Sequence, residues 1–545
     1  MSDIGTPDGE HHQSHQGEEP KTKLSHQSGS LDGEDEDKPF NPDLAQVDRI
    51  LGVKEELDDD GNAVTKYLVK WESKPHNEST WELATDINDD EKVAQFKRIN
   101  QLPPASNGPL ERPAAEEWRP YTESPEFKHG NRLRDYQLEG LNWLVYNWYH
   151  HRNVMLADEM GLGKAVQSIA AMWHLFTVEK IRGPFLVIAP LATISQWKRE
   201  FENWTDMNVL VYQGPAAARQ VIRRYEWNNL DAEGRAISNL FKWNVLVTSY
   251  EMVIADSAHL KTIDWRYTVI DEAHRIKNKN SKLVMELQSY GFSDVLLLTA
   301  TPLQNSIEEL WSLLNLLDPQ KFQSLEDFRN DFDDLGQMEQ MQALHGLLRP
   351  LLLRRMKRDV EQSIDPTQGE TILEVELTGI QEKYYKAIYE QHPYLINGAE
   401  AQILDGLTDP DSISRKLIES SGKLVLVDQL LPRLIAEGHK VVIFSQMVRM
   451  LDILEDYLNF RQFGYERIDS GVCENDRQGA VGRFCEKGSS EDRNVLLLHT
   501  PVSGMGINLP AADTVIIFDS DWGSHQSYVQ AQARFAPTQA VKVYR

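Results

Sequence analysis

The sequence contains very little cysteine. Cys473 and Cys485 are the only two in 545 residues, and their spacing is too wide for a CxxC metal or redox pair. A disulfide framework is thereby excluded, and so few cysteines fit a reducing compartment. A run of about 18 uncharged apolar residues is also missing, which argues against a membrane span. The first residues lack the basic start and apolar centre of a secretory signal.

Positive charge is scarce as well. Lys and Arg number 57 against 84 Asp and Glu, a formal net charge of −27. Over the whole chain this argues against a polyanionic ligand, because phosphate binding depends on Lys and Arg. Part of the acid is segregated, however, since residues 1–40 hold ten acidic residues and three lysines. Their composition predicts a disordered acidic tail, either an interaction segment or a solvated leader.

What is present suggests several domains, roughly three or four at this length. Residues 45–101 combine three short strand patterns with the amphipathic helix EKVAQFKRIN, which predicts a small α+β module. Residues 102–130 are Pro-rich and aperiodic and predict a linker. The helix LRDYQLEGLNWLVYNWY follows. Its Gln137 is a candidate reader of an adenine edge, and the alternative is an exposed helical glutamine.

Apolar strands and amphipathic helices then alternate, which predicts a parallel sheet covered on both faces. The strand patterns are FLVIAP, NVLVTSYE, YTVIDEAH and VLLLTAT, and each ends in polar residues. Ligands of such sheets gather at the carboxyl ends of the strands. A second series begins near Ser421 with GKLVLVDQLLPRLIAEGHKVVIFSQ.

The stretch LADEMGLGKAVQ has the form of a phosphate-binding loop between a strand and a helix. Lys164 would reach the β- and γ-phosphates. The position after it should be Ser or Thr, whose hydroxyl holds Mg²⁺, but here it is Ala165. The candidate nucleotide contacts are Asp158, Glu159, Met160, Gly161, Leu162, Gly163, Lys164 and Ala165.

VIDEAH supplies the second half of this chemistry. Asp271 can hold magnesium, and Glu272 can orient and deprotonate the attacking water. A lone DEAH is weak evidence, but it follows the glycine turn at the spacing of a nucleoside triphosphatase. The hydroxyl-rich loop TATPLQN (Thr299–Asn305) could couple nucleotide state to a second lobe.

Together, LRDYQLEGLNWL, LADEMGLGK, VIDEAHRIKN, LLLTATPLQN and LRRMKRDVE resemble the ATPase motors of the SWI/SNF helicase-like superfamily. YLVKW…STWE resembles a chromodomain, so the chain is similar to chromodomain-helicase-DNA-binding (CHD) remodellers, nearest the kismet-like branch. The resemblance implies two RecA-like parallel-sheet lobes at 131–360 and 421–545, joined by a shortened connection at 361–420. It also implies ATP and Mg²⁺ as cofactors, DNA and nucleosomes as partners, and the nucleus. DEAH-type RNA helicases are the runner-up, but LRRMKRDVE does not suit them.

The resemblance assigns DNA contacts to Thr193, Ser195 and Ser249. Arg354 and Arg355 lie in a local basic cluster, which is either a further DNA contact or a salt-bridging brace between lobes.

The resemblance assigns a methyl-lysine cage position to Trp71, through which a histone tail would bind. Lys74 and Ala45 occupy the other cage positions. A lysine repels a cationic ligand, so a packing module for the motor is favoured over a histone reader.

In the second lobe, Arg534 matches the first of two arginines that reach the γ-phosphate, and the second is lost in FAPTQ. Pro501 replaces another family arginine, and relatives have several tens of residues more near His392. With Ala165, these departures leave two hypotheses: a DNA-dependent ATPase that remodels chromatin, or a catalytically dead chromatin-binding relative.

Overall fold

The computed structural model describes residues 46–57, 62–72, 74–87, 89–102, 112–231, 233–276, 282–299, 307–332, 338–360, 371–390, 409–469, 471–472, 474–485, 493–500, 509, 511–519 and 542–544. The predicted acidic tail, Pro501, Arg534 and the segment around His392 lie outside these residues. In the described part, no helix is long and apolar enough to cross a membrane.

The N-terminal module is an antiparallel sheet closed by one helix, as the sequence predicts. The strands pair in the order β1-β2-β3. Its small core comprises Ile50, Tyr67, Val69 and Ile87, with Phe96 of the helix packed against it. The elements are β1 (Val47–Leu57), β2 (Ala63–Trp71), the 3-10 helix η2 (His76–Glu78), β3 (Thr80–Leu83) and α1 (Asp90–Ile99).

Residues 112–130, the second half of the expected linker, pack against the next domain. Phe127 is buried in that domain's core, and the Trp118 and Tyr146 rings meet edge to face. Arg112 forms an ion pair of 2.5 Å with Asp294. The Pro-rich pattern gives no sign of these contacts because they are made with residues far along the chain. Two 3-10 helices lie here, η3 (Ala115–Glu117) and η4 (Lys128–Gly130).

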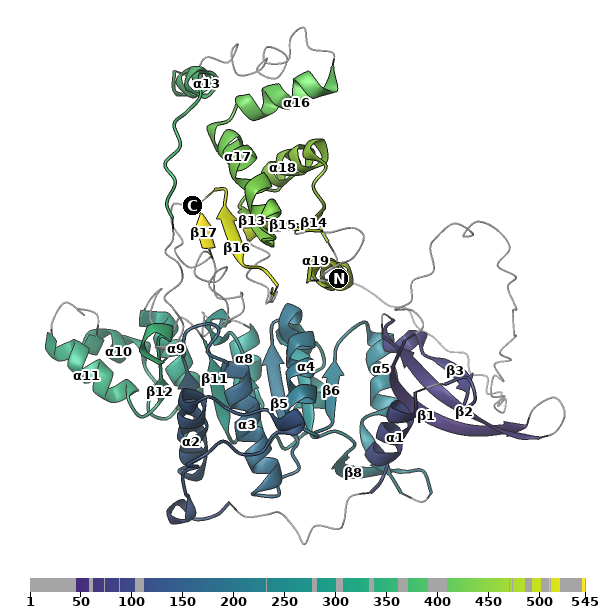
Figure 1. Cartoon of the computed structure of the whole chain (residues 1–545). Helices are drawn as coiled ribbons and strands as arrows, with labels where there is room; N and C mark the ends of the chain where they lie inside the picture. The colour runs from purple at the N-terminus through teal and green to yellow at the C-terminus, as the bar shows by residue number, and fades with distance from the viewer. Residues whose placement is uncertain are drawn as a thin grey trace, which may run out of the picture.

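The first lobe is built on a seven-stranded sheet with the order β12-β4-β11-β10-β5-β9-β6, in which every registered pair is parallel (Figure 1). All four predicted strand patterns of this lobe are strands. The strands are β4 (Val154–Leu156), β5 (Phe185–Ala189), β6 (Val209–Tyr212), β9 (Val245–Ser249), β10 (Tyr267–Ile270), β11 (Val295–Leu298) and β12 (Leu352–Leu353).

Each face of this sheet carries its own apolar core, because successive strand residues point to opposite sides. In β5, Phe185 and Val187 belong to one core, whereas Leu186 and Ile188 belong to the other. The helices are α2 (Asp135–Tyr149), α3 (Lys164–Thr177), the 3-10 helix η5 (Leu191–Thr193), α4 (Ile194–Trp204), α5 (Ala216–Tyr225), α6 (Tyr250–Ala255), α7 (Ser257–Leu260), the 3-10 helix η6 (Ala273–Arg275), α8 (Lys282–Ser289) and α9 (Ile307–Leu317).

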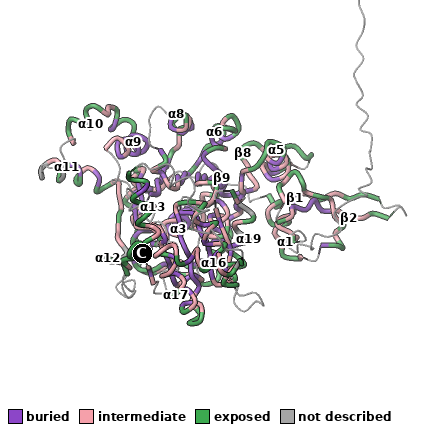
Figure 2. Tube along the Cα trace, turned by 90° about the horizontal axis from the view of Figure 1, so that it is seen from above, coloured by how far each residue is buried: buried purple, intermediate pink, exposed green. Residues whose placement is uncertain are grey.

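Two peripheral features extend this lobe. The helices α10 (Leu325–Phe332) and α11 (Met338–Leu348) build a satellite core with α9 and are otherwise mostly exposed (Figure 2). The strands β7 (Asn228–Leu230) and β8 (Ala236–Phe241) form a separate antiparallel hairpin.

The second lobe contains a five-stranded sheet of order β14-β15-β13-β16-β17, again parallel in every registered pair. Before it, Thr371 pairs with Tyr544 of the last strand. The helix α12 (Lys357–Val360) ends the first lobe, and α13 (Gly379–Tyr389) and α16 (Pro410–Glu419) lie in the connection. The elements of the second lobe are α17 (Gly422–Ala436), β13 (Val441–Ser445), α18 (Val448–Arg461), β14 (Tyr465–Ile468), α19 (Glu474–Cys485), β15 (Val495–His499), β16 (Thr514–Ile517) and β17 (Lys542–Tyr544).

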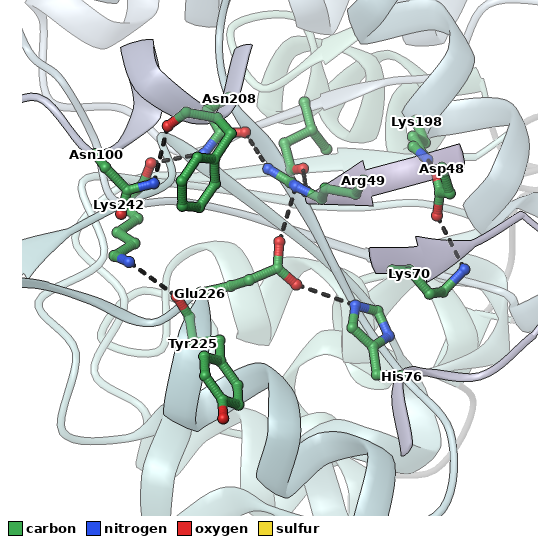
Figure 3. A network of polar contacts seen from close by, with 12 residues as sticks. Asp48, Arg49, Lys70, His76, Asn100, Lys198, Asn208, Tyr225, Glu226 and Lys242 are labelled. Atoms are coloured by element: carbon green, nitrogen blue, oxygen red, sulfur yellow. Dashed lines mark hydrogen bonds and ion pairs between the residues drawn. The ribbon is translucent and has the colours of Figure 1, made fainter. Parts of the chain in front are cut away.

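The N-terminal module is docked on the first lobe beside α5 (Figure 1). Arg49 of β1 forms an ion pair of 2.8 Å with Glu226, and the carboxylate of Glu226 also lies 3.0 Å from the ring of His76 (Figure 3). Nearby, Asp48 lies 2.8 Å from Lys198 of α4 and 2.9 Å from Lys70. These charges are largely buried and paired, which indicates a specific interface between the N-terminal module and the first lobe.

Candidate nucleotide-binding and DNA-binding site

The phosphate-type loop joins β4 to α3 as the sequence predicts. Gly161 and Gly163 adopt φ values of +88° and +80°, a region that favours glycine. Gly163 is the N-cap of α3 and provides no side-chain cap. The first N–H groups of α3 therefore form an uncapped, electropositive helix end, which suits a phosphate.

Gln137 lies against this loop. Its Nε2 donates to the carbonyl oxygen of Leu162 at 3.2 Å, and its Oε1 accepts from the backbone N–H of Arg134 at 3.1 Å. A Cβ on Gly163 would approach Gln137 Nε2 to 2.4 Å. Gln137 is 8% exposed, so it is not the exposed helical glutamine of the alternative interpretation.

Lys164 begins α3 and turns back toward the loop. Its Nζ donates to the carbonyl oxygen of Asp158 at 2.9 Å. Burial lowers the pKa of Lys164, and the carboxylates of Glu272 and Asp271 oppose that shift. The two sequence motifs therefore meet in space, with the ammonium group in the field of both carboxylates.

Asp271 directly follows β10. Its Oδ2 accepts from Trp197 Nε1 and its Oδ1 from the Glu272 backbone N–H, each at 2.9 Å. Burial and the neighbouring Glu272 raise the pKa of Asp271 to about 6. Glu272 has a left-handed φ of +52°, an uncommon conformation for glutamate that suits a functional turn. Sequence reasoning missed Trp197, which lies 74 residues from the aspartate that it holds.

The residues present fit a magnesium-bound nucleotide only in part. Among the described residues, no group of three or more His, Cys, Asp or Glu side chains could hold a metal ion alone. Asp271 supplies one carboxylate. Ala165 packs its methyl against the apolar core and supplies no oxygen. A magnesium ion here would need phosphate oxygens and water to complete its ligands.

The three residues assigned to DNA lie at the carboxyl ends of two neighbouring strands. Thr193 and Ser195 follow β5, and Ser249 is the last residue of β9. Thr193 donates through Oγ1 to the carbonyl oxygen of Pro190 at 2.9 Å, and Ser195 lies in the first turn of α4. Both are half-buried. Ser249 is buried and caps α6 by accepting from the N–H of Met252 at 3.4 Å.

The two predicted basic residues lie differently. Arg354 is exposed. Arg355 is 12% exposed and forms a 2.6 Å ion pair with the fully buried Asp158. That ion pair lies inside the first lobe, so a DNA contact by Arg355 would require it to be broken.

Trp71 ends β2 and packs against the small core of the N-terminal module. Its Nε1 donates to Thr80 Oγ1 at 2.9 Å, so the polar edge of the ring is already bonded within the module.

In the second lobe, Asp519 is held at the end of β16. Its carboxylate accepts from Ser445 Oγ and from the backbone N–H of Gln446, each at 2.6 Å. The arginine Arg534 stays a prediction, because it lies outside the described residues.

Comparison with family models agrees with this architecture. Residues 45–99 match the chromo (chromatin organisation modifier) domain, residues 136–422 the SNF2-related domain and residues 422–536 the helicase conserved C-terminal domain. The SNF2-related match alone covers more than half of the chain, which defines the class of ATPase motor.

Similar curated proteins narrow the class. The chain is 51% identical to chromodomain-helicase-DNA-binding protein 6 of Rattus norvegicus, over 93% of this chain and 20% of the relative. It is 49% identical to chromodomain-helicase-DNA-binding protein 8 of Homo sapiens, over 96% of this chain and 22% of the relative. The chain belongs to the CHD family, and it spans about a fifth of the length of these relatives.

Among solved structures, the Sulfolobus solfataricus SWI2/SNF2 ATPase core in complex with dsDNA is 24% identical. The match covers 78% of this chain and 89% of the Sulfolobus solfataricus chain, with a TM-score of 0.41.

Proposed function

We propose that this chain is the motor region of an ATP-dependent chromatin remodeller, a DNA-dependent ATPase that acts on nucleosomal DNA in the nucleus. The observation that carries the proposal is the meeting of Lys164 with Asp271 and Glu272 beside an uncapped helix end. Membership of the SNF2-related family supports the use of ATP.

Each side chain has a role that follows from its position. The α3 N-terminus and Lys164 bind phosphate oxygens. Gln137 supports the loop through its bond to Leu162 and is placed to contact the adenine edge. Glu272 orients the attacking water and takes its proton. Asp271 would hold a magnesium ion, which when bound would neutralise phosphate charge.

The DNA track would run along the carboxyl ends of β5 and β9. Thr193 and Ser195 are half-buried at the start of α4, so each keeps some exposed surface. Ser249 is buried and would contact DNA through its backbone or after local movement. Ser195 lies in α4 and Thr193 directly precedes it. Trp197 of the same helix holds Asp271, so DNA and the proposed catalytic aspartate would contact one helix.

The N-terminal module fits the role of a packing module better than that of a histone reader. Its interface with the first lobe buries several ion pairs, and Trp71 is bonded within the module. Histone-tail binding through Trp71 remains the second candidate.

Hydrolysis should be impaired. Ala165 supplies no magnesium ligand, and the sequence lacks the second arginine of the second lobe. An arginine finger contributes roughly three to five orders of magnitude in rate. The alternative function is that of a catalytically dead chromatin-binding relative that binds nucleotide or DNA without efficient turnover.

Titration with a fluorescent ATP analogue tests the nucleotide site directly. Lys164→Ala should weaken binding at least ~10-fold, because a charge-assisted phosphate contact is worth about 1.5–3 kcal/mol. Glu272→Gln should keep the affinity, since Glu272 acts on water, and should remove any residual hydrolysis. Equal affinity for the parent chain and Lys164→Ala would contradict the site.

A further inference from the structure

Arg355 lies where the last strand of the first lobe leaves the sheet. Its backbone N–H donates to Asp158 Oδ1 at 3.1 Å, and its carbonyl oxygen accepts from the N–H of Glu159 at 3.0 Å. The chain then continues into α12 and on toward Thr371, which pairs with the second lobe. Arg355 is thus attached to both the nucleotide loop and the exit from the lobe.

The side chain of Arg355 grips Asp158 with two parallel bonds. Nε lies 3.1 Å from Oδ1, and Nη2 lies 2.6 Å from Oδ2. Asp158 is fully buried, so its carboxylate oxygens are bonded by protein groups and not by solvent. A bidentate guanidinium–carboxylate pair is both strong and specific in geometry.

The network continues from this pair into the loop. Gln167 accepts from Arg355 Nη2 at 2.7 Å and donates to Asp158 Oδ2 at 3.1 Å. The same amide nitrogen lies 3.3 Å from the carbonyl oxygen of Leu162, which Gln137 also bonds. Asp158 in turn offers its carbonyl oxygen to Lys164.

The helix α2 is shaped to admit this network. A Cβ on Gly140 would lie 1.9 Å from Gln167 Oε1 and 3.0 Å from Arg355 Nη2. Glycine costs about 1 kcal/mol relative to alanine in a helix interior. Glycine at position 140 therefore weakens the helix, but it allows the Gln167 amide to approach the backbone closely.

We infer that Arg355 is a positioning residue for the nucleotide: through Asp158 and Gln167 it holds the loop 158–164 in its phosphate-binding shape. It also ties that shape to the segment that leads toward the second lobe. The inference rests on the proposed function for its ligand, but it predicts the order of the loop with no ligand present.

The test compares the full chain with Arg355→Gln, the double variant Arg355→Gln/Asp158→Asn, and Arg349→Gln as a control. Arg349 is an exposed arginine shortly before the same strand. Three quantities are measured: melting temperature, affinity for a fluorescent ATP analogue, and amide hydrogen exchange of residues 158–168 without nucleotide.

Arg355→Gln should weaken nucleotide affinity at least tenfold and speed exchange in the loop, whereas Arg349→Gln should change neither. The double variant removes the unpaired buried carboxylate, so it should regain melting temperature but not affinity or slow exchange. Recovery of all three by the double variant, or parent-like affinity and exchange in Arg355→Gln, would overturn the inference.

Gly140→Ala provides an arm that leaves every charge in place. It should speed exchange in the loop and weaken nucleotide binding, although alanine favours the helix. A parent-like loop in Gly140→Ala would count against the network. If the parent chain binds no nucleotide, the proposed function fails, while hydrogen exchange still decides the inference.

Discussion

Among single residues, Gly163 in the loop between β4 and α3 meets two separate requirements. Its backbone adopts a positive φ, and a side chain at this position would collide with Gln137. Gly163 has φ +80°, and a Cβ there would meet Gln137 Nε2 at 2.4 Å. Gly163→Ala should lower the free energy of unfolding of the first lobe by about 2 kcal/mol, since a strained backbone costs about 1–3 kcal/mol and the contact adds to it. Thermal unfolding measures the loss.

Gly291 is a matched control for that substitution. It also has a positive φ, +62°, but nothing lies within 4 Å of its added Cβ. Gly291→Ala should therefore lower the free energy of unfolding only by the strain of a positive φ at alanine. If both variants lose equal stability, the close approach of Gln137 has no energetic importance.

The sequence predicts candidate reacting residues, and the structure adds residues that hold them in place. Lys164, Asp271 and Glu272 could be proposed from the sequence because the proposed chemistry needs fixed residue types at fixed spacing along strands and turns. Trp197, Gln167 and the ion pair between Arg355 and Asp158 could not. A hydrogen bond between residues 74 or 197 positions apart leaves no local pattern.

At the scale of elements, the interface between the chromodomain and the first lobe shifts the pKa values of two carboxylates. Burial would raise the pKa of Asp48, but the ammonium groups of Lys198 and Lys70 outweigh it and hold that pKa well below its usual range. Burial would likewise raise the pKa of Glu226, but Arg49 and His76 outweigh it and lower that pKa. These carboxylates therefore stabilise the fold in their charged form.

Asp48→Asn should lower stability by about 1–2 kcal/mol, because Lys198 and Lys70 lose their shared partner in a partly solvated site. A depressed folded pKa contributes stability above the ordinary value of 3.8 that is lost as the pH falls below it. The gap in melting temperature between the parent and Asp48→Asn should thus be constant from about pH 7 to 5 and shrink below about pH 4.

Glu56→Gln serves as the control, since Glu56 is paired only with Lys54 and Lys66 of its own sheet among the ion pairs found. Its effect should be within about 0.5 kcal/mol. A gap for Asp48→Asn that grows on acidification would contradict the assigned electrostatics.

The helices and strands could be predicted from the sequence, but the tertiary contacts between segments could not. The continuous apolar runs specified the parallel strands, because strands covered on both faces must be apolar throughout. Residues 112–130 were expected to be a linker, yet Phe127 and Trp118 pack against the first lobe. Proline-rich composition reports the absence of regular structure and says nothing about tertiary contact.

At the scale of the whole molecule, the acidic total and a DNA-directed function are compatible. Net charge sums over regions that never meet the same ligand, and about seven of the 27 excess negative charges belong to residues 1–40. The order of chromodomain, first lobe and second lobe was predictable from composition and motifs. How the chromodomain sits on the first lobe emerged only from the structure.

We propose that this chain is a DNA-directed ATPase whose hydrolysis is limited by the missing oxygen at Ala165. The decisive measurement is nucleosome-stimulated ATP hydrolysis by the parent chain and by Ala165→Thr, side by side. The restored hydroxyl should raise the rate at least ~10-fold if it recovers about 1.4 kcal/mol of transition-state stabilisation. Failure of the revertant to gain activity would shift the defect to the lost second arginine. Brisk hydrolysis by the parent chain, unchanged in Ala165→Thr, would show that the missing hydroxyl does not limit the reaction.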